Sequence, residues 1–552
     1  MDPTLYYRMS SCLHTYRICV LMILCVLTLS LMAQSVTFPV YLGGDFSKLP
    51  TLEEKNKLYL DDNGQPVSDV LRWVREEKSF NSIRVRLFVD PSHAPEQYAG
   101  WGADQDMPMV KALGKRIKDL GMAFMLDFHY SDTWADPGKQ IIPYGWDQLS
   151  DEELYVKIYE YTKESLKELK EAGAMPDLIQ IGNEISFGML RGPYCDMGSS
   201  EYSWTRFITL LQKASKACRE ECPEAKIIIH TERLGQRDYL EFFYEKMKQV
   251  DYDIIGTSYY RQWHGDMAGM DASLSMLEEK FSDKDIMIVE TSYVHCDNGE
   301  FGFEFPMTEQ GQDDFTCTLI KILWKHPRVT GLYWWQPDDG WGALWDDETG
   351  RALRALTSMK AFLTKQAEGL DNDVTSWYLE NPSFISDLSG WTNTDGTAFW
   401  KENTWDVLSN YCDFVWNGQP IKDQEVVQSP TLPAGNYRLS VNCASDDCSR
   451  GLYLIAHDSK TEMPGTGGID SYSVTFSVPV DGPVKMGLKV ENTTATWANL
   501  DNFKLEKAVE TAIGSIDYQS HVTPYIFNLA GQRLSKPQKG INIMNGKKVI
   551  LK

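Results

Sequence analysis

The sequence LIQIGNE at residues 178–184 joins a short apolar run to an Asn-Glu pair, and IMIVE at residues 286–290 ends on a glutamate in the same way. Short apolar runs bounded by polar residues are typical of strands buried in a parallel sheet. Six similar runs occur between residues 40 and 335: VYLGG (40–44), SIRVRLFV (82–89), AFMLDFH (123–129), KIIIH (226–230), DIIGTS (253–258) and GLYWW (331–335). The eight runs predict eight β-strands.

Apolar residues at helical spacing lie between these runs. Val110, Leu113 and Ile117 mark one helix, and Ser150 with Glu153 predicts a capping box at the start of another. Eight strand–helix units within residues 34–370 have the size of a (β/α)8 TIM barrel. A doubly wound α/β sheet is the alternative, but it usually has fewer strands and a glycine-rich phosphate-binding loop, which we do not find.

The composition changes after residue 370. Residues 371–508 are rich in Thr, Ser, Asn, Asp and Gly and contain alternating stretches such as YRLSVN (437–442) and SYSVTFSV (471–478), which predict a β-sandwich. This segment opens with ENPSF (380–384), closes with WANLDNFKL (497–505) and resembles carbohydrate-binding jelly rolls; the sequence leaves open whether it binds sugar. Residues 509–552 form a third piece, whose end (525–552) resembles the C-terminal sorting domains of type IX secretion; a plain basic tail is the alternative.

The N-terminus has the layout of a secretory signal peptide. Arg8 and Arg17 precede an apolar run at residues 18–32, and the small residue Ala33 follows. A membrane anchor is the alternative, but this run is shorter than the ~20 residues that a spanning helix needs. We therefore expect residues 1–33 to be removed and the protein to be secreted, periplasmic or on the cell surface, without a membrane-spanning segment.

The overall charge excludes some partners. A net charge of −24 argues against binding to nucleic acid or to an anionic membrane surface. The 17 Trp and 27 Tyr residues fit either a rich core or a cleft that stacks sugars, and composition does not separate the two. We expect a monomer.

Polar residues gather where the predicted strands end. In a TIM barrel the carboxyl ends of all strands meet at the catalytic face. Buried ionisable groups are costly without partners, so a ring of polar strand ends indicates an active site. The residues concerned are Asp45, Arg84, Arg86, Asp127, His129, Asn183, Glu184, His230, Glu232, Tyr259, Glu290 and Trp335.

Two of these residues suit glycoside hydrolysis, which needs a carboxylic acid beside the leaving oxygen and a second carboxylate opposite. Glu184 follows strand four and Glu290 ends strand seven, and these strand ends face each other across a barrel mouth. A separation of ~5–5.5 Å would make the enzyme retaining, with Glu184 as acid/base and Glu290 as nucleophile. The alternatives are a first-turn helix carboxylate for Glu184 and an ion pair with Arg84 or Arg86 for Glu290.

Five stretches carry a specific resemblance: DFHYSDTWADPGKQ (127–140), QIGNEISFGML (180–190), GTSYY (256–260), VETSY (289–293) and YWWQPD (333–338). Together they resemble glycoside hydrolase family 53, the endo-β-1,4-galactanases, over residues 38–365. The resemblance implies that the substrate is β-1,4-galactan, the galactan of pectic arabinogalactan side chains.

The resemblance also implies roles for the residues around the two glutamates. Asp127 and His129 would line the subsite of the cleaved bond, Trp134 and Trp335 would stack on galactose rings, and Tyr259 would approach the nucleophile. Period-two alternation places Asp127 with His129, and Arg84 with Arg86, on one strand face each, which supports their pointing inward. An Asn183 amide can bind a sugar 2-hydroxyl. Our predicted substrate-binding set is Arg84, Arg86, Asp127, His129, Trp134, Asn183, His230, Tyr259 and Trp335.

No cofactor is expected. Bacterial relatives in the family often carry a calcium ion between the loops after strands seven and eight, but HCDNGEFGFEF (295–305) lacks a clear series of oxygen ligands, so structural calcium stays open. Two other functions remain alternatives: a non-catalytic polysaccharide-binding surface protein on a decayed barrel, and an enzyme of the same clan that acts on β-mannan or β-glucan.

Overall fold

The computed structural model describes residues 39–99, 104–190, 194–296, 305–385, 387–402 and 410–508, and four short strands between residues 526 and 551. The predicted signal segment 1–33 lies outside the described residues. Within the described ranges, no helix is both long enough and apolar enough to cross a membrane.

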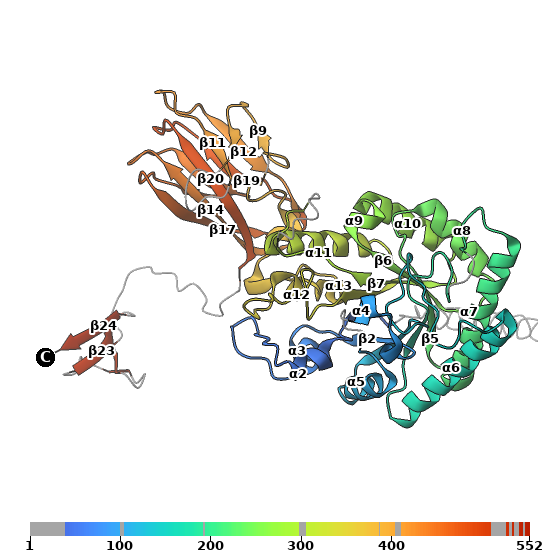
Figure 1. The fold of residues 1–552 in the computed structure, drawn as a ribbon. Helices are drawn as coiled ribbons and strands as arrows, with labels where there is room; N and C mark the ends of the chain where they lie inside the picture. Colours follow the sequence, from blue (N-terminus) through green and yellow to red (C-terminus); the bar gives the residue numbers. More distant parts are fainter. Residues whose placement is uncertain are drawn as a thin grey trace, which may run out of the picture. The chain divides into compact units, whose positions relative to one another are not determined.

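Eight parallel strands form a closed barrel in the order β1 to β8 (Figure 1). The barrel closes between β1 and β8, where Tyr41 pairs with Gly331 and Asp45 with Trp335. Each predicted run overlaps one strand, which confirms the TIM barrel. The strands are β1 (Tyr41–Asp45), β2 (Ser82–Leu87), β3 (Ala123–Phe128), β4 (Leu178–Ile181), β5 (Lys226–Thr231), β6 (Ile254–Tyr259), β7 (Asp285–Thr291) and β8 (Val329–Trp335).

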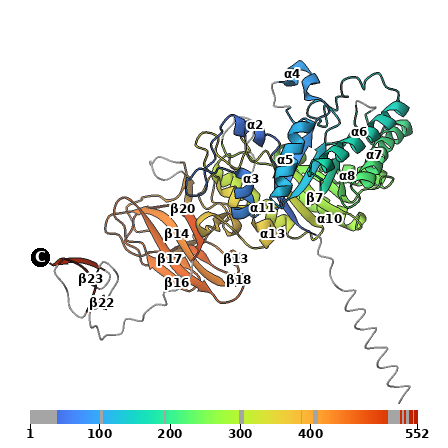
Figure 2. The ribbon, with the colours of Figure 1, turned by 90° about the horizontal axis from the view of Figure 1, so that it is seen from below.

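Helices cover the outside of the barrel, and α5, α6 and α7 lie side by side there (Figures 1 and 2). The predicted capping box is present at α6, where Ser150 and Glu153 bond each other's backbone N–H groups. The helices are α2 (Leu49–Glu54), α3 (Val70–Glu77), η1 (Pro91–His93), α4 (Glu96–Ala99), α5 (Met107–Asp119), α6 (Asp151–Glu171), α7 (Glu201–Glu221), α8 (Arg237–Met247), α9 (Arg261–His264), α10 (Met267–Lys280), α11 (Glu309–Leu323), α12 (Arg354–Ser358), α13 (Ala361–Thr364), η2 (Leu370–Asn372) and α14 (Thr375–Tyr378).

Antiparallel sheets follow the barrel, as the alternating sequence predicted. One five-stranded sheet has the order β10-β11-β20-β14-β17 and the other β16-β15-β19-β12-β9, and β13 pairs with β18. The strands are β9 (Thr392–Asn393), β10 (Phe399–Lys401), β11 (Tyr411–Phe414), β12 (Gln424–Gln428), β13 (Thr431–Leu432), β14 (Gly435–Ser445), β15 (Leu452–Ala456), β16 (Ser459–Glu462), β17 (Ile469–Val478), β18 (Gly482–Pro483), β19 (Met486–Val490) and β20 (Ala498–Lys507).

The C-terminal tail is a separate unit that begins at Ala508. Its described strands form one sheet in the order β22-β21-β23-β24. They are β21 (Ile526–Asn528), β22 (Arg533–Leu534), β23 (Gly540–Met544) and β24 (Lys547–Leu551).

The interior of the barrel is apolar in one layer and polar in the next. Met125, Leu178 and Ile228 belong to a buried cluster contributed by neighbouring strands. Two residues further along, on the same strand face, come Asp127, Gln180 and His230, all fully buried. The polar layer therefore lies toward the carboxyl ends of the strands, which is the catalytic side of this fold.

Asp338, which follows β8, should make folding stability depend on pH. Its side chain is fully buried, and burial followed by the charges of Asp45 and Asp339 raises its pKa to about 7. Between its unfolded value near 4 and 7, the unfolded chain binds fewer protons at this site, so this group makes the protein less stable as pH rises through that window. Above pH 7 its effect is constant.

We expect Asp338→Asn to raise the free energy of unfolding at pH 8 by up to about 4 kcal/mol, at about 1.4 kcal/mol for each pKa unit, and to change it little at pH 4. Thermal unfolding of both proteins at the two pH values measures this difference. An Asp338→Asn protein with the same stability relative to wild type at both pH values would contradict the assignment.

Candidate active site

A cavity of 640 Å³ opens where the barrel strands end. Its walls combine carboxylates, amides, cations and aromatic rings, which is the mixture expected of a polar-ligand site. The lining residues are Arg86, His129, Trp134, Ala135, Asp136, Pro137, Asn183, Glu184, Glu232, Arg233, Gln236, Tyr260, Gln262, Trp263, His264, Glu290, Ser292 and Trp335. Glu184 and Glu290, predicted from separate strands, thus share one cavity.

Arg84 is the centre of a buried ion network behind this cavity. Its Nη1 lies 2.7 Å from Asp45 Oδ2, and its Nη2 lies 2.7 Å from Asp127 Oδ2 and 2.8 Å from Glu290 Oε1. The same Nη2 donates a hydrogen bond to Asn183 Oδ1 at 2.8 Å. The ion pair between Glu290 and Arg84 that the sequence suggested is therefore present, and it favours the ionised carboxylate.

Glu290 has a second donor. Tyr260 Oη donates to Glu290 Oε2 at 2.9 Å, so both carboxylate oxygens are held. Burial raises the pKa of Glu290, and the positive charge of Arg84 acts against that rise. The arrangement fixes both carboxyl oxygens of Glu290 at the cavity wall.

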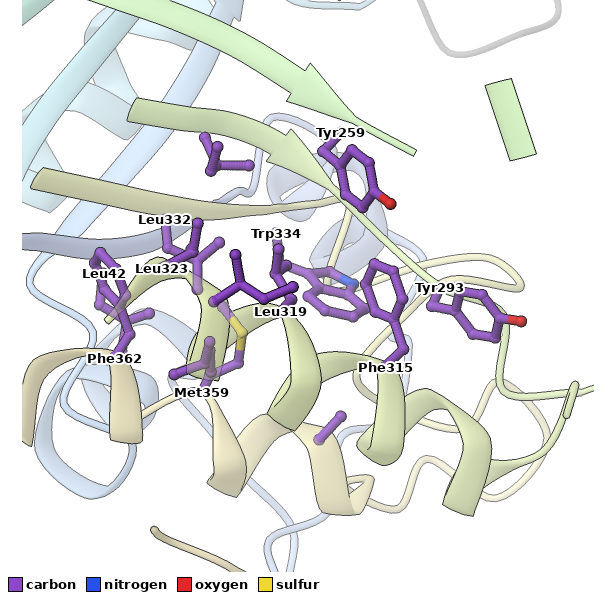
Figure 3. Packing of buried hydrophobic residues seen from close by; sticks show 14 of the residues in the cluster. Leu42, Tyr259, Tyr293, Phe315, Leu319, Leu323, Leu332, Trp334, Met359 and Phe362 are labelled. Carbon is purple, nitrogen blue, oxygen red and sulfur yellow. The ribbon is translucent and has the colours of Figure 1, made fainter. Parts of the chain in front are cut away.

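Tyr259, the tyrosine predicted to approach the nucleophile, does not do so. It is fully buried, its Oη donates to Gly265 O at 3.1 Å, and its ring lies parallel to that of Phe315 at 6.4 Å. Figure 3 shows Tyr259 in the apolar cluster with Phe315 and Trp334. The contact with Glu290 belongs to Tyr260, which continues the inward-facing alternation past Ser258.

Glu184 sits at the end of a hydrogen-bonded chain. Ser258 Oγ donates to Glu184 Oε1 at 2.8 Å and lies 2.8 Å from His230 Nε2, while the Glu184 backbone N–H donates to His230 Nδ1 at 3.3 Å. The Glu184 N–H contact favours a neutral imidazole with its proton on Nε2, while Nδ1 also lies 3.0 Å from Asn183 Oδ1. Burial, followed by the positive charge of Arg84, lowers the pKa of His230 well below its usual value, in agreement.

Glu184 differs from Glu290 in charge environment. Burial and then the negative charges of Glu290 and Glu232 raise the pKa of Glu184 well above its usual value. No cation is among these main influences, whereas Glu290 has Arg84. Glu184 also has a φ of 47°, a left-handed backbone conformation that is uncommon outside glycine and that concentrates at functional sites. The pair thus has one carboxyl poised to hold a proton and one poised to be ionised.

His129 is oriented by contacts at both ring nitrogens. Its Nδ1 accepts a hydrogen bond from the Ala135 N–H at 2.9 Å, and its Nε2 lies 2.9 Å from Asp127 Oδ2. Burial lowers the pKa of His129, which favours the neutral ring. Because Nδ1 accepts a hydrogen bond, the proton of the neutral ring lies on Nε2. Asp127 is in turn bonded by Gln180 Nε2 at 2.5 Å.

Apart from Tyr259, the predicted substrate-binding residues fall into two groups. Arg86, His129, Trp134, Asn183 and Trp335 line the cavity, while the neighbouring Trp334 is fully buried. Three others do not line the cavity and lie behind the lining residues with no exposed surface: Arg84, Asp127 and His230. These three act on the lining residues and not on a bound ligand.

Sequence reasoning missed one wall of the cavity. Arg233 and Gln236 follow β5, and Trp263 lies in α9 after β6. Trp263 is 61% exposed, although a tryptophan side chain is large and apolar. A tryptophan in the polar segment RQWHGD (261–266) was the available signal, but only the fold places it at this cavity.

The described residues contain no group of three or more His, Cys, Asp or Glu side chains that could hold a metal ion. Most of the loop considered for calcium, residues 297–304, lies outside the described ranges.

Comparison with known proteins gives several consistent matches. An uncharacterised protein from Niallia circulans is 33% identical over 360 residues, which cover 59% of this chain and 95% of the relative. The endo-beta-1,4-galactanase of Bacillus subtilis is 29% identical over 310 residues, covering 53% of this chain and 69% of the relative. The solved GH53 catalytic domain of Ignisphaera aggregans is 31% identical with a TM-score of 0.51, covering 59% of this chain and 98% of that domain.

The family profile of glycosyl hydrolase family 53 matches residues 41–376. This match covers more than half of the 552 residues and includes both glutamates of the cavity. It begins at the first barrel strand and ends in α14, after the barrel has closed. The barrel, the paired glutamates and the profile agree that this chain belongs to glycosyl hydrolase family 53.

Proposed function

We propose that this protein is a retaining endo-β-1,4-galactanase that cleaves within β-1,4-galactan chains by double displacement. The observation that carries the proposal is the contrast between two carboxyls in one cavity: Glu290 is bonded by Arg84 and Tyr260, while Glu184 has a strongly raised pKa. Membership of family 53 and relatives named as galactanases, from Bacillus subtilis and Cellvibrio japonicus, support the choice of sugar.

In the first step, the Glu290 carboxylate attacks the anomeric carbon while Glu184 gives its proton to the departing glycosidic oxygen. This forms a galactosyl ester on Glu290 and releases the shortened chain. In the second step, Glu184 takes a proton from water, the water oxygen attacks the anomeric carbon, and Glu290 leaves as a carboxylate. Two inversions give net retention of the β configuration.

The surrounding residues support these steps. Arg84 keeps Glu290 ionised, and Asp127 orients His129 toward the cavity. Asn183 is held by Arg84 and donates to Ala135 O at 2.8 Å, which leaves its second amide N–H for a sugar hydroxyl. Trp134 and Trp335 provide apolar faces for galactose rings.

Product analysis tests this function against the alternatives. Purified protein is incubated with galactan, mannan and cellulose, and the products are separated by size over time. We expect internal cleavage of galactan, with a rapid fall in mean chain length and a range of oligosaccharides. Preferred cleavage of mannan or cellulose would overturn the substrate assignment, and binding to galactan without any product would favour the non-catalytic alternative.

A substitution at Tyr260 tests whether its hydrogen bond to Glu290 contributes to catalysis. Tyr260→Phe removes the hydrogen bond to Glu290, and we expect kcat on galactan to fall by roughly 10²-fold, the loss typical of a removed active-site donor. Tyr259→Phe is the matched control, because it removes a hydroxyl bonded to Gly265 O behind the cavity. Steady-state kinetics of both variants provide the measurement. Equal losses in the two variants would contradict the placement of Tyr260.

We also infer that the protein is exported. The basic and apolar layout of residues 1–33 supports secretion to the periplasm, the cell surface or the medium, where a polysaccharide substrate is accessible. Action as a monomer and the absence of a required cofactor stay predictions from the sequence.

A further inference from the structure

The cavity wall that follows β5 and β6 consists of Glu232, which the sequence had singled out, and of Arg233, Gln236 and Trp263, which it had not; we call it the β5–β6 wall. Its two loops are packed backbone against backbone. A Cβ atom added to Gly235 would lie 1.5 Å from His264 O, so only glycine allows the loop after β5 to approach α9 this closely. The wall is therefore contributed jointly by the segment after β5 and by α9, which follows β6.

The polar side chains of this wall are held in place. Glu232 is 6% exposed, accepts a hydrogen bond from Ser186 Oγ and pairs with Arg233 Nε at 3.1 Å. The Arg233 guanidinium carbon lies 4.3 Å from the centre of the Phe187 ring, and its Nη1 donates to Gln236 Oε1 at 2.5 Å. A cation fixed by a carboxylate, an amide and an aromatic face is preorganised for binding.

Strand order sets which part of a sugar chain this wall can meet. In the closed barrel, β4 and β7 carry Glu184 and Glu290 and divide the ring into two arcs. Strands β5 and β6 form the short arc, and β8, β1, β2 and β3 form the long arc. The cleaved bond lies between the two glutamates, so the sugars on its two sides occupy different arcs.

The ion network around Arg84 indicates which side of the cleaved bond each arc would bind. Arg84, Asp45 and Asp127 lie on the long arc, and Arg84 contacts Glu290 directly. Arg86 and His129 line the cavity on this arc and are held by Asp45 and Asp127, so polar side chains are available there to the sugar that becomes attached to Glu290. Glu232, on the short arc, is instead among the charges that act on Glu184, the residue beside the leaving oxygen.

We propose that the β5–β6 wall is the binding site for the leaving-group side of the chain, with Trp263 as the platform on which the first released galactose ring stacks. This inference rests on the proposed galactanase function and adds a residue to it. A pyranose presents a C–H face to an indole, and its hydroxyls face Arg233, Gln236 and Glu232 as donors and acceptors. In the second step, the same site receives any sugar acceptor that replaces water.

The test compares two substrates of which only one places a sugar on the leaving-group side. β-1,4-Galactan places a sugar there, whereas β-galactobiosyl fluoride places a single fluorine atom there and leaves the long arc filled. For Trp263→Ala we expect the ratio of kcat/KM on galactan to kcat/KM on the fluoride to fall about tenfold, which corresponds to loss of one stacking contact of about 1.4 kcal/mol. Transfer of galactobiose to an added galactobiose acceptor should fall in parallel.

Trp341→Ala is the matched control, because Trp341 is 58% exposed in the loop after β8 and does not line the cavity. It should leave the ratio unchanged. An unchanged ratio in Trp263→Ala, whether both substrates slow equally or neither does, overturns the inference. If the wild-type protein releases neither fluoride nor galactan fragments, the proposed function itself fails, and the two failures are thus distinguishable.

Discussion

Glu290→Gln is expected to lower kcat on β-1,4-galactan by several orders of magnitude, because an amide cannot form the galactosyl ester of a double displacement. The variant should fold. Glutamine has nearly the same shape, and Tyr260 can still bond its oxygen. Arg84 also keeps its ion pairs with Asp45 and Asp127. Steady-state kinetics together with the thermal unfolding midpoint measure the two parts of this expectation.

Glu279→Gln is a suitable control for the same substitution at an exposed position of α10. It should leave both kcat and the unfolding midpoint unchanged. A folded Glu290→Gln protein that keeps more than about a tenth of the wild-type rate would remove Glu290 from the nucleophile role.

Glu184→Ala should instead affect substrates unequally. Protonation by Glu184 matters most when the leaving group is a sugar hydroxyl, which is a poor leaving group. An aryl galactoside with an acidic phenol hardly needs that proton, so its first step should survive while galactan cleavage is largely lost. The galactosyl-enzyme should then accumulate, because no base activates water in the second step.

Added azide tests this accumulation directly, since azide is a nucleophile that needs no base. It should restore turnover of the aryl substrate and give β-galactosyl azide, the product of two inversions. An α-azide would mean a single inversion and would overturn the mechanism. If azide has no effect and both substrates slow equally, Glu184 is not the acid/base, and Glu232 becomes the next candidate at this cavity.

The barrel and the paired glutamates could be predicted from the sequence because both depend on local pattern. A strand has a period of two, so Asp127 and His129 had to share a face, and strand order set Glu184 opposite Glu290. Tyr259 was the exception. The prediction stopped at the strand end, although the same alternation continues past Ser258 to Tyr260.

The remaining features depend on tertiary contacts that no local pattern encodes. Arg84 was expected to bind substrate, but the barrel brings Asp45, Asp127 and Glu290 around its guanidinium and buries it completely. The position of Trp263 depends on the close approach of Gly235 to α9, which joins residues from two separate loops. Contacts of this kind, between residues from separate segments, can be identified only in the folded structure.

Trapping the covalent intermediate tests the central claim most directly. In a 2-deoxy-2-fluoro galactobioside, the fluorine slows both formation and hydrolysis of the galactosyl ester, and a good leaving group speeds formation alone. A double-displacement enzyme should therefore accumulate as its fluorosugar ester. Mass spectrometry of the digested protein should find the added sugar on the peptide that contains Glu290. The fraction of protein that is labelled should equal the fraction of activity that is lost. A sugar on Glu184 or Glu232, or rapid turnover to an α-configured product with no adduct, would contradict the account.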